Sequence, residues 1–228
     1  MEVLHNGFTL ELSQDAFPLS TDSMALAGFV RMPKNARVLD LGSGCGTIGL
    51  LLCANDPSCQ VTGVELDPAA HEMAMHNAQA NHISSRLTSI CENISNIPNL
   101  IQSGAMTTVV CNPPYFSGGP AAKLTLARRD DLCDMNTLMK AAAWALQYGG
   151  DLFLVHRPER LAELFSCASA HKLEPKRLQL LRHTATGPVS LVLVQCRKGA
   201  KPGLLWEEEF LFDTEGNSSA YRNLLYHL

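Results

Sequence analysis

From residue 37 onward, short apolar runs alternate with segments of helical character, and this alternation constrains the fold more than any other feature. The run ARVLDLG is typical of a strand and leads through glycines into TIGLLLCAN, which is typical of a helix. The same order recurs as far as residue 172 with short connections. Parallel strands need crossover helices that cover both faces of their sheet. The pattern therefore predicts an α/β fold with a mainly parallel sheet.

We expect a seven-stranded sheet of this kind, with an antiparallel hairpin at one edge. The expected strands of the alternating part are 36–42, 60–66, 86–94, 106–112 and 151–156, and the expected helices are 47–55, 68–82, 136–150 and 158–172. The hairpin joins 177–183 to 189–198 through the turn TATGP. Residues 204–212 are expected to be a further extended segment, and 219–228 a terminal helix.

The segment before residue 37 is predicted to form a short strand and a short helix. Residues 8–12 alternate as FTLEL, which is typical of a strand. Ser20, Thr21 and Asp22 offer side chains that cap a helix N-terminus, ahead of an apolar stretch that ends before Pro33. We interpret 1–228 as a single domain, with 1–36 as an N-terminal extension and 37–228 as its core.

Composition restricts the class of protein. Hydrophobic residues make up 46% and charged residues 18%, which is an ordinary globular balance. The net charge of −4 provides no general attraction for nucleic acid, so any such contact would use a local patch. The eight cysteines form no CxxC pair, which favours reduced thiols in the cytoplasm. We find no signal peptide and no apolar run near the roughly 20 residues that span a bilayer.

A glycine loop follows the first strand of the alternating part. Gly42, Gly44 and Gly46 lie between that strand and a helix, where glycine lets a ligand approach the backbone closely. A tight strand-to-helix turn is the alternative. Glu65 ends the next strand, 21 residues beyond Gly44, where a carboxylate can accept from both hydroxyls of a ribose. Because the loop lacks the G-x-G-x-x-G pattern, we expect a nucleoside rather than a dinucleotide.

A second motif, NPPY, ends the strand 106–112. Asn112 precedes Pro113 and is therefore held extended, and Pro113 and Pro114 together make a stiff corner. The Asn112 side-chain oxygen and a nearby backbone carbonyl form two acceptors that match a planar –NH2 group. Tyr115 can lie on the flat face of the group that carries it. A proline-rich turn with a capping asparagine is the alternative, which the neighbouring glycine loop disfavours.

In the order DLGSGCG, VELDP and NPPYF, these motifs resemble the class I S-adenosylmethionine-dependent methyltransferases, a Rossmann-like fold. FPLSTDSMALAGFV, ARRD and the C-terminal DTEGNSSAYRNLLYHL are similar to the tRNA1(Val) adenine-37 N6-methyltransferase family. The resemblance covers nearly the whole chain. It implies tRNA modification by methylation of an adenine N6 amine, with S-adenosylmethionine as the cofactor and 37–228 as the part that binds it.

The resemblance also implies roles for single residues. The methionine end of the cofactor would be lined by Asp40, Gly42, Gly44 and Gly46, with Thr21 and Asp22 nearby. Glu65 would bind the ribose. The target amine would be held by Asn112, Pro113 and Tyr115. One position departs from the family, because Asn93-Ile94 stands where Asp-Ile is usual. Asn93 can still accept from the cofactor adenine through its amide oxygen.

Transfer from a sulfonium requires no metal and no strong base, and well-aligned reactants gain roughly 7–11 kcal/mol from positioning. An adenine in an RNA loop would have to be unstacked into the pocket. Basic side chains near it would then contact phosphates. The candidates are Lys123, Arg128, Arg129, Lys172, Lys176, Arg177 and Arg182. A solvated surface is the alternative for the C-terminal members of this set.

Three other functions stay open on the motifs alone. One is N5-methylation of a protein glutamine, as in the release-factor family, although that family usually carries a larger N-terminal domain. The second is amino-methylation of rRNA or DNA by another NPPY enzyme. The third is a cofactor-binding module without turnover, which the intact NPPY motif disfavours. The sequence leaves the oligomeric state open.

Overall fold

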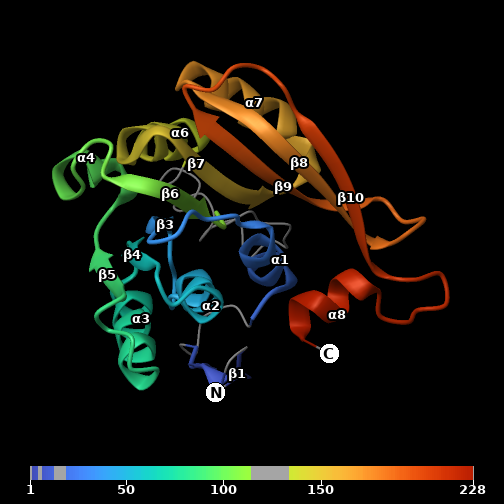
Figure 1. The fold of residues 1–228 in the computed structure, drawn as a ribbon, viewed down its shortest axis with the longest axis horizontal. Helices are drawn as coiled ribbons and strands as arrows, with labels where there is room; N and C mark the ends of the chain where they lie inside the picture. Colours follow the sequence, from blue (N-terminus) through green and yellow to red (C-terminus); the bar gives the residue numbers. More distant parts are fainter. Residues whose placement is uncertain (1, 5–6, 13–18, 114–133, 228) are drawn as a thin grey trace, which may run out of the picture.

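The computed structural model describes residues 2–4, 7–12, 19–113 and 134–227. At its centre is an eight-stranded sheet with the order β10-β8-β9-β7-β6-β3-β4-β5 (Figure 1). The strands are β3 (Arg37–Leu41), β4 (Gln60–Glu65), β5 (Leu87–Cys91), β6 (Met106–Cys111), β7 (Leu146–His156), β8 (Leu173–Thr184), β9 (Val189–Lys198) and β10 (Leu205–Phe212). Only β9 runs against its neighbours, and the other neighbouring pairs are parallel.

Helices cover both faces of this sheet. The helices are α1 (Thr21–Phe29), α2 (Thr47–Asn55), α3 (Pro68–Ala80), α4 (Ile97–Leu100), α6 (Met135–Ala145), α7 (Leu161–Ala170) and α8 (Ala220–Tyr226), with two 3₁₀ turns, η2 (Ile94–Asn96) and η3 (Pro158–Arg160). Figure 1 shows α4, α6 and α7 on one side, and α1, α2, α3 and α8 on the other. Among the described residues, no helix is long and apolar enough to cross a membrane.

The apolar pattern of the strands explains the two layers. Successive strand residues point to opposite faces. Val38 and Val110 accordingly join the apolar cluster beneath α1 and α2, whereas Leu39 and Val109 join the cluster beneath α6 and α7. All four side chains are at most 1% exposed. The buried β3–β6 pair therefore forms the middle of the core, and its ends are rigidly placed.

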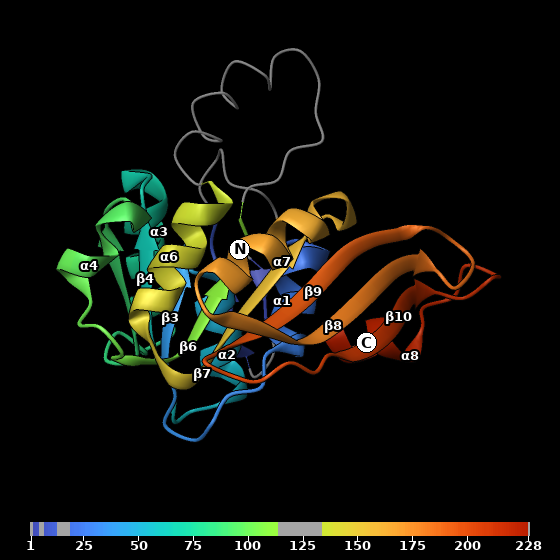
Figure 2. The same ribbon diagram turned by 90° about the horizontal axis from the view of Figure 1, so that it is seen from above.

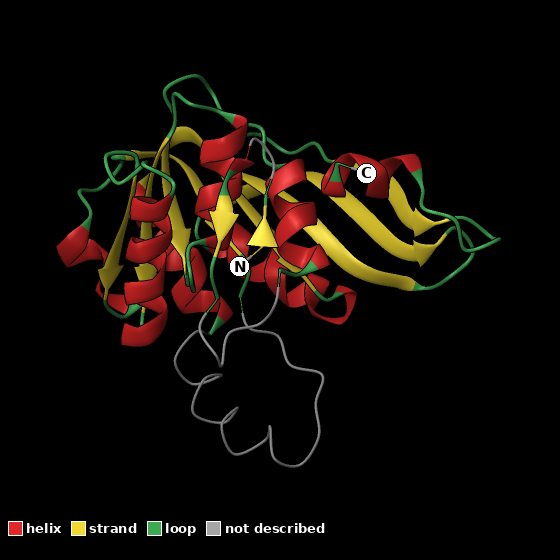
Figure 3. Ribbon diagram, turned by 90° about the horizontal axis from the view of Figure 1, so that it is seen from below, coloured by secondary structure: helices red, strands yellow, loops and turns green. Residues whose placement is uncertain are grey.

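The predicted fold class is confirmed, but the sheet has eight strands rather than seven. The extended segment that we expected near 204–212 forms β10, which pairs in parallel with β8. The β8–β9 hairpin therefore lies one strand inside the edge. In Figures 2 and 3, the end of the sheet that holds β8, β9 and β10 extends away from α3 and α4, which lie at the opposite end. The predicted strand within 8–12 is confirmed as β2 (Thr9–Leu10), which pairs with β1 (Glu2–Val3) in a separate small sheet.

One predicted helix is too long. The sequence favoured a helix over 136–150 with glycines at its end, whereas α6 stops at Ala145 and β7 begins at once. Gly149 has a φ of +78°, and a Cβ on Gly150 would lie 2.9 Å from the Thr107 carbonyl oxygen. The pairing with β6 shifts register at this point. The two glycines therefore serve an irregular strand start and not a helix end.

Candidate functional site

The predicted motifs meet at the carboxyl edge of the sheet. Chain order reverses between β3 and β6, and such a reversal is where ligands of open α/β sheets bind. Asp40 lies opposite Val110 in the register of these strands. The Cys111 thiol donates to the Leu41 carbonyl oxygen at 3.1 Å, which ties the two strand ends together. The glycine loop after β3 and Asn112 after β6 thus start side by side.

The three glycines of the loop serve two purposes. All have left-handed backbones, with φ of +73° at Gly42, +54° at Gly44 and +81° at Gly46. A Cβ on Gly42 or Gly44 would meet no described atom within 4 Å, so both border open space. A Cβ on Gly46 would lie 3.3 Å from the Ala74 Cβ on α3. Gly42 and Gly44 are therefore the positions suited to a ligand, and Gly46 lets α3 pack closely.

Asp40 is a buried carboxyl with no hydrogen-bonding partner in the described part of the chain. It is 1% exposed, and neither carboxyl oxygen has a hydrogen-bonding partner among the described residues. Burial, and secondarily the negative charge of Glu65, raise the pKa of Asp40 to about 7, and the nearby Gly49 N–H opposes this rise without forming a hydrogen bond. Such a group suits a positively charged or donating ligand, since buried polar atoms are normally paired.

Glu65 braces the glycine loop. Its Oε2 accepts from the Gly44 N–H and its Oε1 from the Asp67 N–H, both at 2.8 Å. Each oxygen of the Glu65 carboxylate can accept a further hydrogen bond, so the carboxylate can still accept from the two hydroxyls of a ribose. The structure thus brings Glu65 to the loop, as the spacing predicts. Its contact with a ribose stays a prediction.

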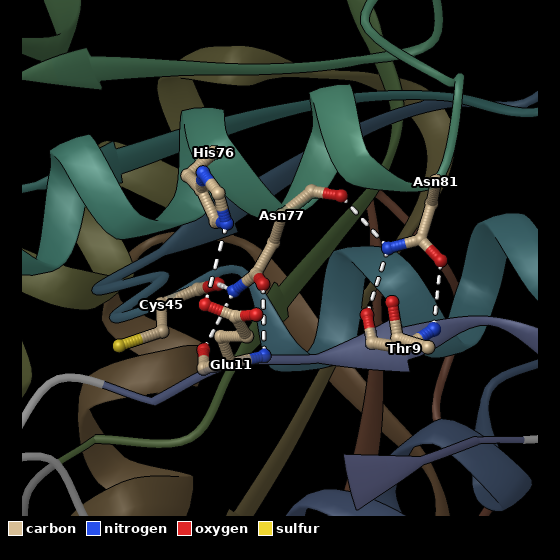
Figure 4. A network of polar contacts seen from close by, with 6 residues as sticks. All are labelled: Thr9, Glu11, Cys45, His76, Asn77 and Asn81. Carbon is tan, nitrogen blue, oxygen red and sulfur yellow. Dashed lines mark hydrogen bonds and ion pairs between the residues drawn. The ribbon is translucent and has the colours of Figure 1, made fainter. Parts of the chain in front are cut away.

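Sequence reasoning missed a second brace, Asn77 of α3, which is fully buried (Figure 4). Its Nδ2 donates to the Cys45 carbonyl oxygen of the glycine loop at 3.0 Å and to the Glu11 carbonyl oxygen at 2.8 Å. One turn later, Asn81 exchanges two hydrogen bonds of 2.7 Å with the backbone of Thr9. Two asparagines four residues apart lie on one helix face, and this spacing was the available signal.

Asn112 is half-buried and is held from the other side of the site. Its Nδ2 donates to the Ser23 Oγ on α1 at 3.2 Å. Pro113 behind it is buried. Pro114 and Tyr115, which the sequence assigns to the same corner, lie outside the described residues. Ser23 is thus a second residue that sequence reasoning missed, although it belongs to the quoted STDS stretch.

Two expected cofactor contacts have other partners in the structure. The Asn93 Oδ1 accepts from the Ser95 N–H at 2.8 Å and so caps η2. Asn93 still lies beside Glu65 at the sheet edge, because the Glu92 N–H donates to the Glu65 carbonyl oxygen at 2.9 Å. Its adenine contact stays a prediction. The Thr21 hydroxyl lies 2.8 Å from the Tyr226 hydroxyl on α8.

The C-terminal basic residues do not form a free cationic patch. Arg177 is 8% exposed, stacks on Phe29 and pairs with Glu207 at 3.2 Å, so its expected phosphate contact is wrong. Arg182 donates to the Gly187 carbonyl oxygen at 2.7 Å. Lys172 is exposed, and the Lys176 ammonium donates to a loop carbonyl oxygen at 3.1 Å. The other three candidates, Lys123, Arg128 and Arg129, lie outside the described residues.

Known proteins resemble this chain in sequence and in fold. A family model described as "methyltransferase small domain" matches residues 19–166. A Porphyromonas gingivalis protein named tRNA1(Val) (adenine(37)-N6)-methyltransferase is 30% identical over 186 residues, which are 77% of this chain and 72% of the relative. A Bacteroides fragilis protein of the same name is 30% identical over 79% of this chain and 76% of the relative.

Among solved structures, a protein of Agrobacterium tumefaciens described as a "predicted O-methyltransferase" superposes with a TM-score of 0.77. The superposition covers 91% of this chain and 96% of that one, at 19% sequence identity. At this identity the likeness establishes the fold and leaves the chemistry to the site.

Proposed function

This chain belongs to the methyltransferase small domain family, and on that premise we propose that it methylates the exocyclic N6 amine of an adenine in tRNA, with S-adenosylmethionine as the donor. One observation carries the proposal. Asp40, which is buried and has no hydrogen-bonding partner among the described residues, lies near the end of β3, and Asn112, whose amide nitrogen donates to Ser23, follows the neighbouring strand β6. The relatives' names support tRNA as the substrate and adenine N6 as the acceptor.

The residues at the carboxyl ends of β3 and β4 and in the glycine loop fit S-adenosylmethionine. Asp40 offers a carboxylate to a positively charged methionine end, and Gly42 and Gly44 leave room for it. Glu65 is placed to accept from ribose hydroxyls, and Gly46 keeps the loop against α3. When bound, the cofactor supplies an electrophilic methyl group on a good leaving group. The contribution of these residues is to bind and orient it.

On the acceptor side, the residues of the NPPY corner hold the amine. The Asn112 amide oxygen and the Pro113 carbonyl oxygen would each accept one hydrogen of the –NH2 group. An aryl amine is a poor nucleophile, because its lone pair is delocalised into the ring. Two acceptors on its hydrogens favour a pyramidal nitrogen, which localises that lone pair. Tyr115 would stack on the base, and base–aromatic stacking contributes about 1–3 kcal/mol.

These acceptors follow a buried strand, so an adenine has to leave its stack to reach them, as enzymes that act on bases generally require. Because the net charge is −4, contact with the phosphates would be local. Lys172 is exposed, but it precedes β8 and therefore lies at the edge of the sheet opposite to Asn112, whereas Arg182 near the end of β8 lies at the same edge as the site. A tRNA substrate supports a cytoplasmic location for the protein.

The test is methyl transfer to bulk tRNA, followed by nucleoside mass analysis. We expect N6-methyladenosine to appear only when both the protein and S-adenosylmethionine are present. Purified release factor serves as the competing acceptor in a parallel reaction. Methylated glutamine in that reaction, with unmodified tRNA, would replace the proposal by the protein-directed alternative. Cofactor binding without transfer to either acceptor would contradict both.

A further inference from the structure

We propose that Ser23 is a positioning residue that fixes which end of the Asn112 amide faces the substrate. This inference rests on the proposed function, in which the Asn112 oxygen receives a hydrogen of the substrate amine. The Ser23 Oγ accepts from the Asn112 Nδ2 at 3.2 Å. With its nitrogen held in this way, the amide presents its oxygen on the opposite side.

The need for such a residue follows from the shape of the amide. The two ends of an asparagine side chain are nearly the same size, but the oxygen only accepts and the nitrogen only donates. Pro113 restricts the backbone of Asn112 and leaves the rotation of its amide free. If the nitrogen faced the substrate, two donors would oppose the two hydrogens of the amine. A neutral asparagine therefore requires a second group that binds one of its ends.

The hydrogen bonds around Ser23 support a fixed direction. Ser20 caps α1 by accepting from the Ser23 N–H at 3.2 Å, and its own hydroxyl donates to the Ser23 Oγ at 3.3 Å. The Ser23 Oγ thus accepts twice, once from Ser20 and once from Asn112, which uses both its lone pairs. In this arrangement the Asn112 nitrogen, and not its oxygen, lies against α1.

Ser23 is itself held firmly. Its side chain lies in the first turn of α1 and the residue is 8% exposed. At the other end of α1, a Cβ on Gly28 would lie 2.7 Å from the Leu225 Cδ2, so this helix packs closely on α8. The Thr21–Tyr226 hydroxyl contact of 2.8 Å joins the same two helices. The acceptor for the Asn112 nitrogen is therefore part of the packed core.

This arrangement also determines the class of substrate. A site that offers fixed acceptors favours a group that donates two hydrogens, as an exocyclic amine does. A carbonyl or an ionised hydroxyl at the same place would leave these oxygens unpaired, and acceptors left unpaired in a binding site disfavour such a ligand. Ser23 would therefore contribute to selectivity for amines as well as to rate.

The first experiment compares Ser23→Ala with Ser219→Ala. Both serines are 8% exposed and lie at the start of a helix, but the Ser23 Oγ accepts from the Asn112 amide, whereas the Ser219 Oγ accepts from the Arg222 N–H at the start of α8. We expect Ser23→Ala to lower kcat about 5- to 10-fold, the scale of one hydrogen bond, with unchanged cofactor affinity. Ser219→Ala should lower Tm and leave kcat as in the wild type. Equal kcat losses in both variants would show a structural role and overturn the proposal.

The second experiment removes the need for orientation. An aspartate at position 112 has two accepting oxygens, so rotation no longer matters. We expect Ser23→Ala to lower kcat much less in an Asn112→Asp background than in the wild type. The same fold-change in both backgrounds would contradict a positioning role.

A third measurement is independent of turnover. In protein labelled with ¹⁵N-asparagine, the Asn112 side-chain signal is identified by its absence in Asn112→Asp. Hydrogen exchange of this –NH2 group should be slow in the wild type and faster in Ser23→Ala. Unchanged exchange would overturn the inference. If the wild type methylates no tRNA, the proposed function fails, whereas this signal still decides whether Ser23 holds the amide.

Discussion

The two loops that leave the sheet beside each other, one after β3 and one after β6, are held in place in different ways. In the glycine loop, the Gly42 and Ser43 N–H groups donate to the Val64 carbonyl oxygen, and Gly44 donates to Glu65. These contacts come from the strand that follows in the chain. Asn112 is held by Ser23, which lies 89 residues earlier and outside the alternating part. The cofactor half is therefore a local unit, and the acceptor half is assembled from distant segments.

The largest expected effect is the loss of cofactor binding when the glycine loop alone is changed. Gly44→Val should abolish S-adenosylmethionine binding, because its side chain would enter the space that the loop leaves open. Isothermal titration calorimetry measures this directly. Unchanged affinity in a folded variant would show that the ligand lies elsewhere.

Gly216→Val is the matched control for the strain of Gly44→Val. Gly216 also has a left-handed backbone, with a φ of +85°, and a Cβ there would also meet nothing within 4 Å. Both variants should lose stability through backbone strain of about 1–3 kcal/mol. Only the Gly44 variant should lose its ligand.

The next effect concerns the stability of the cofactor half without its ligand. The pKa of Asp40 is raised from 3.8 to about 7, so the folded chain binds more protons than the unfolded chain between these values. Its contribution to the free energy of unfolding is fully present below pH 3.8 and is lost as the pH rises through about 7. The loss corresponds to about 4 kcal/mol. Asp40→Asn should therefore be more stable than the wild type at pH 8 and similar to it at pH 4.

Urea unfolding of both proteins at pH 4, 6 and 8 measures this difference. Other titrating groups are common to the two proteins, so the difference between them isolates Asp40. Parallel pH profiles would mean that the Asp40 carboxyl is not destabilised by its burial. The same variant should bind S-adenosylmethionine more weakly than the wild type at pH 8.

The third prediction concerns a change in the acceptor half alone, which should lower turnover and leave cofactor binding unchanged. Asn112→Ala should keep its affinity for S-adenosylmethionine and lose kcat by about 100-fold, the scale of removing one preorganised hydrogen-bonding group from an active site. Calorimetry and single-turnover methylation of tRNA separate the two effects. A parallel loss of cofactor affinity would show that the two halves are not independent.

The smallest expected effect tests whether Glu65 contacts the cofactor directly or acts through the glycine loop. Glu65→Ala should weaken S-adenosylmethionine binding by about 1–3 kcal/mol, the scale of hydrogen bonds to a charged group. Because Glu65 also braces Gly44, part of this loss could come from the loop. A cofactor analogue that lacks both ribose hydroxyls separates the contributions. An equal loss for the analogue would assign the whole effect to the loop.

The difference between the two halves also explains what the sequence could predict. The strand–helix alternation, the glycine loop and Glu65 depend on spacing within short segments, and spacing is visible in a sequence. The place of β10 beside β8 was not visible, because no local pattern says which neighbour an extended segment will choose. The end of α6 was misplaced because a glycine pair fits both a helix end and an irregular strand start.

The contacts that the sequence did not reveal are those between distant segments. Ser23 is an unremarkable helix residue until α1 is docked beside β6. Asn77 gave a better signal, since an asparagine at a buried helix position needs partners for its amide. The burial of Arg177 against Phe29 was likewise unpredictable, because arginine is usually exposed.

The close packing of α1 on α8 has a consequence for the order in which the site is built during synthesis. The segments that brace the glycine loop are available as soon as α3, which carries Asn77, has left the ribosome. The helix that holds Asn112 rests on Leu225 and Tyr226, which are added more than a hundred residues later. A nascent chain can thus form its cofactor half early, while the half that receives the substrate waits for the last helix.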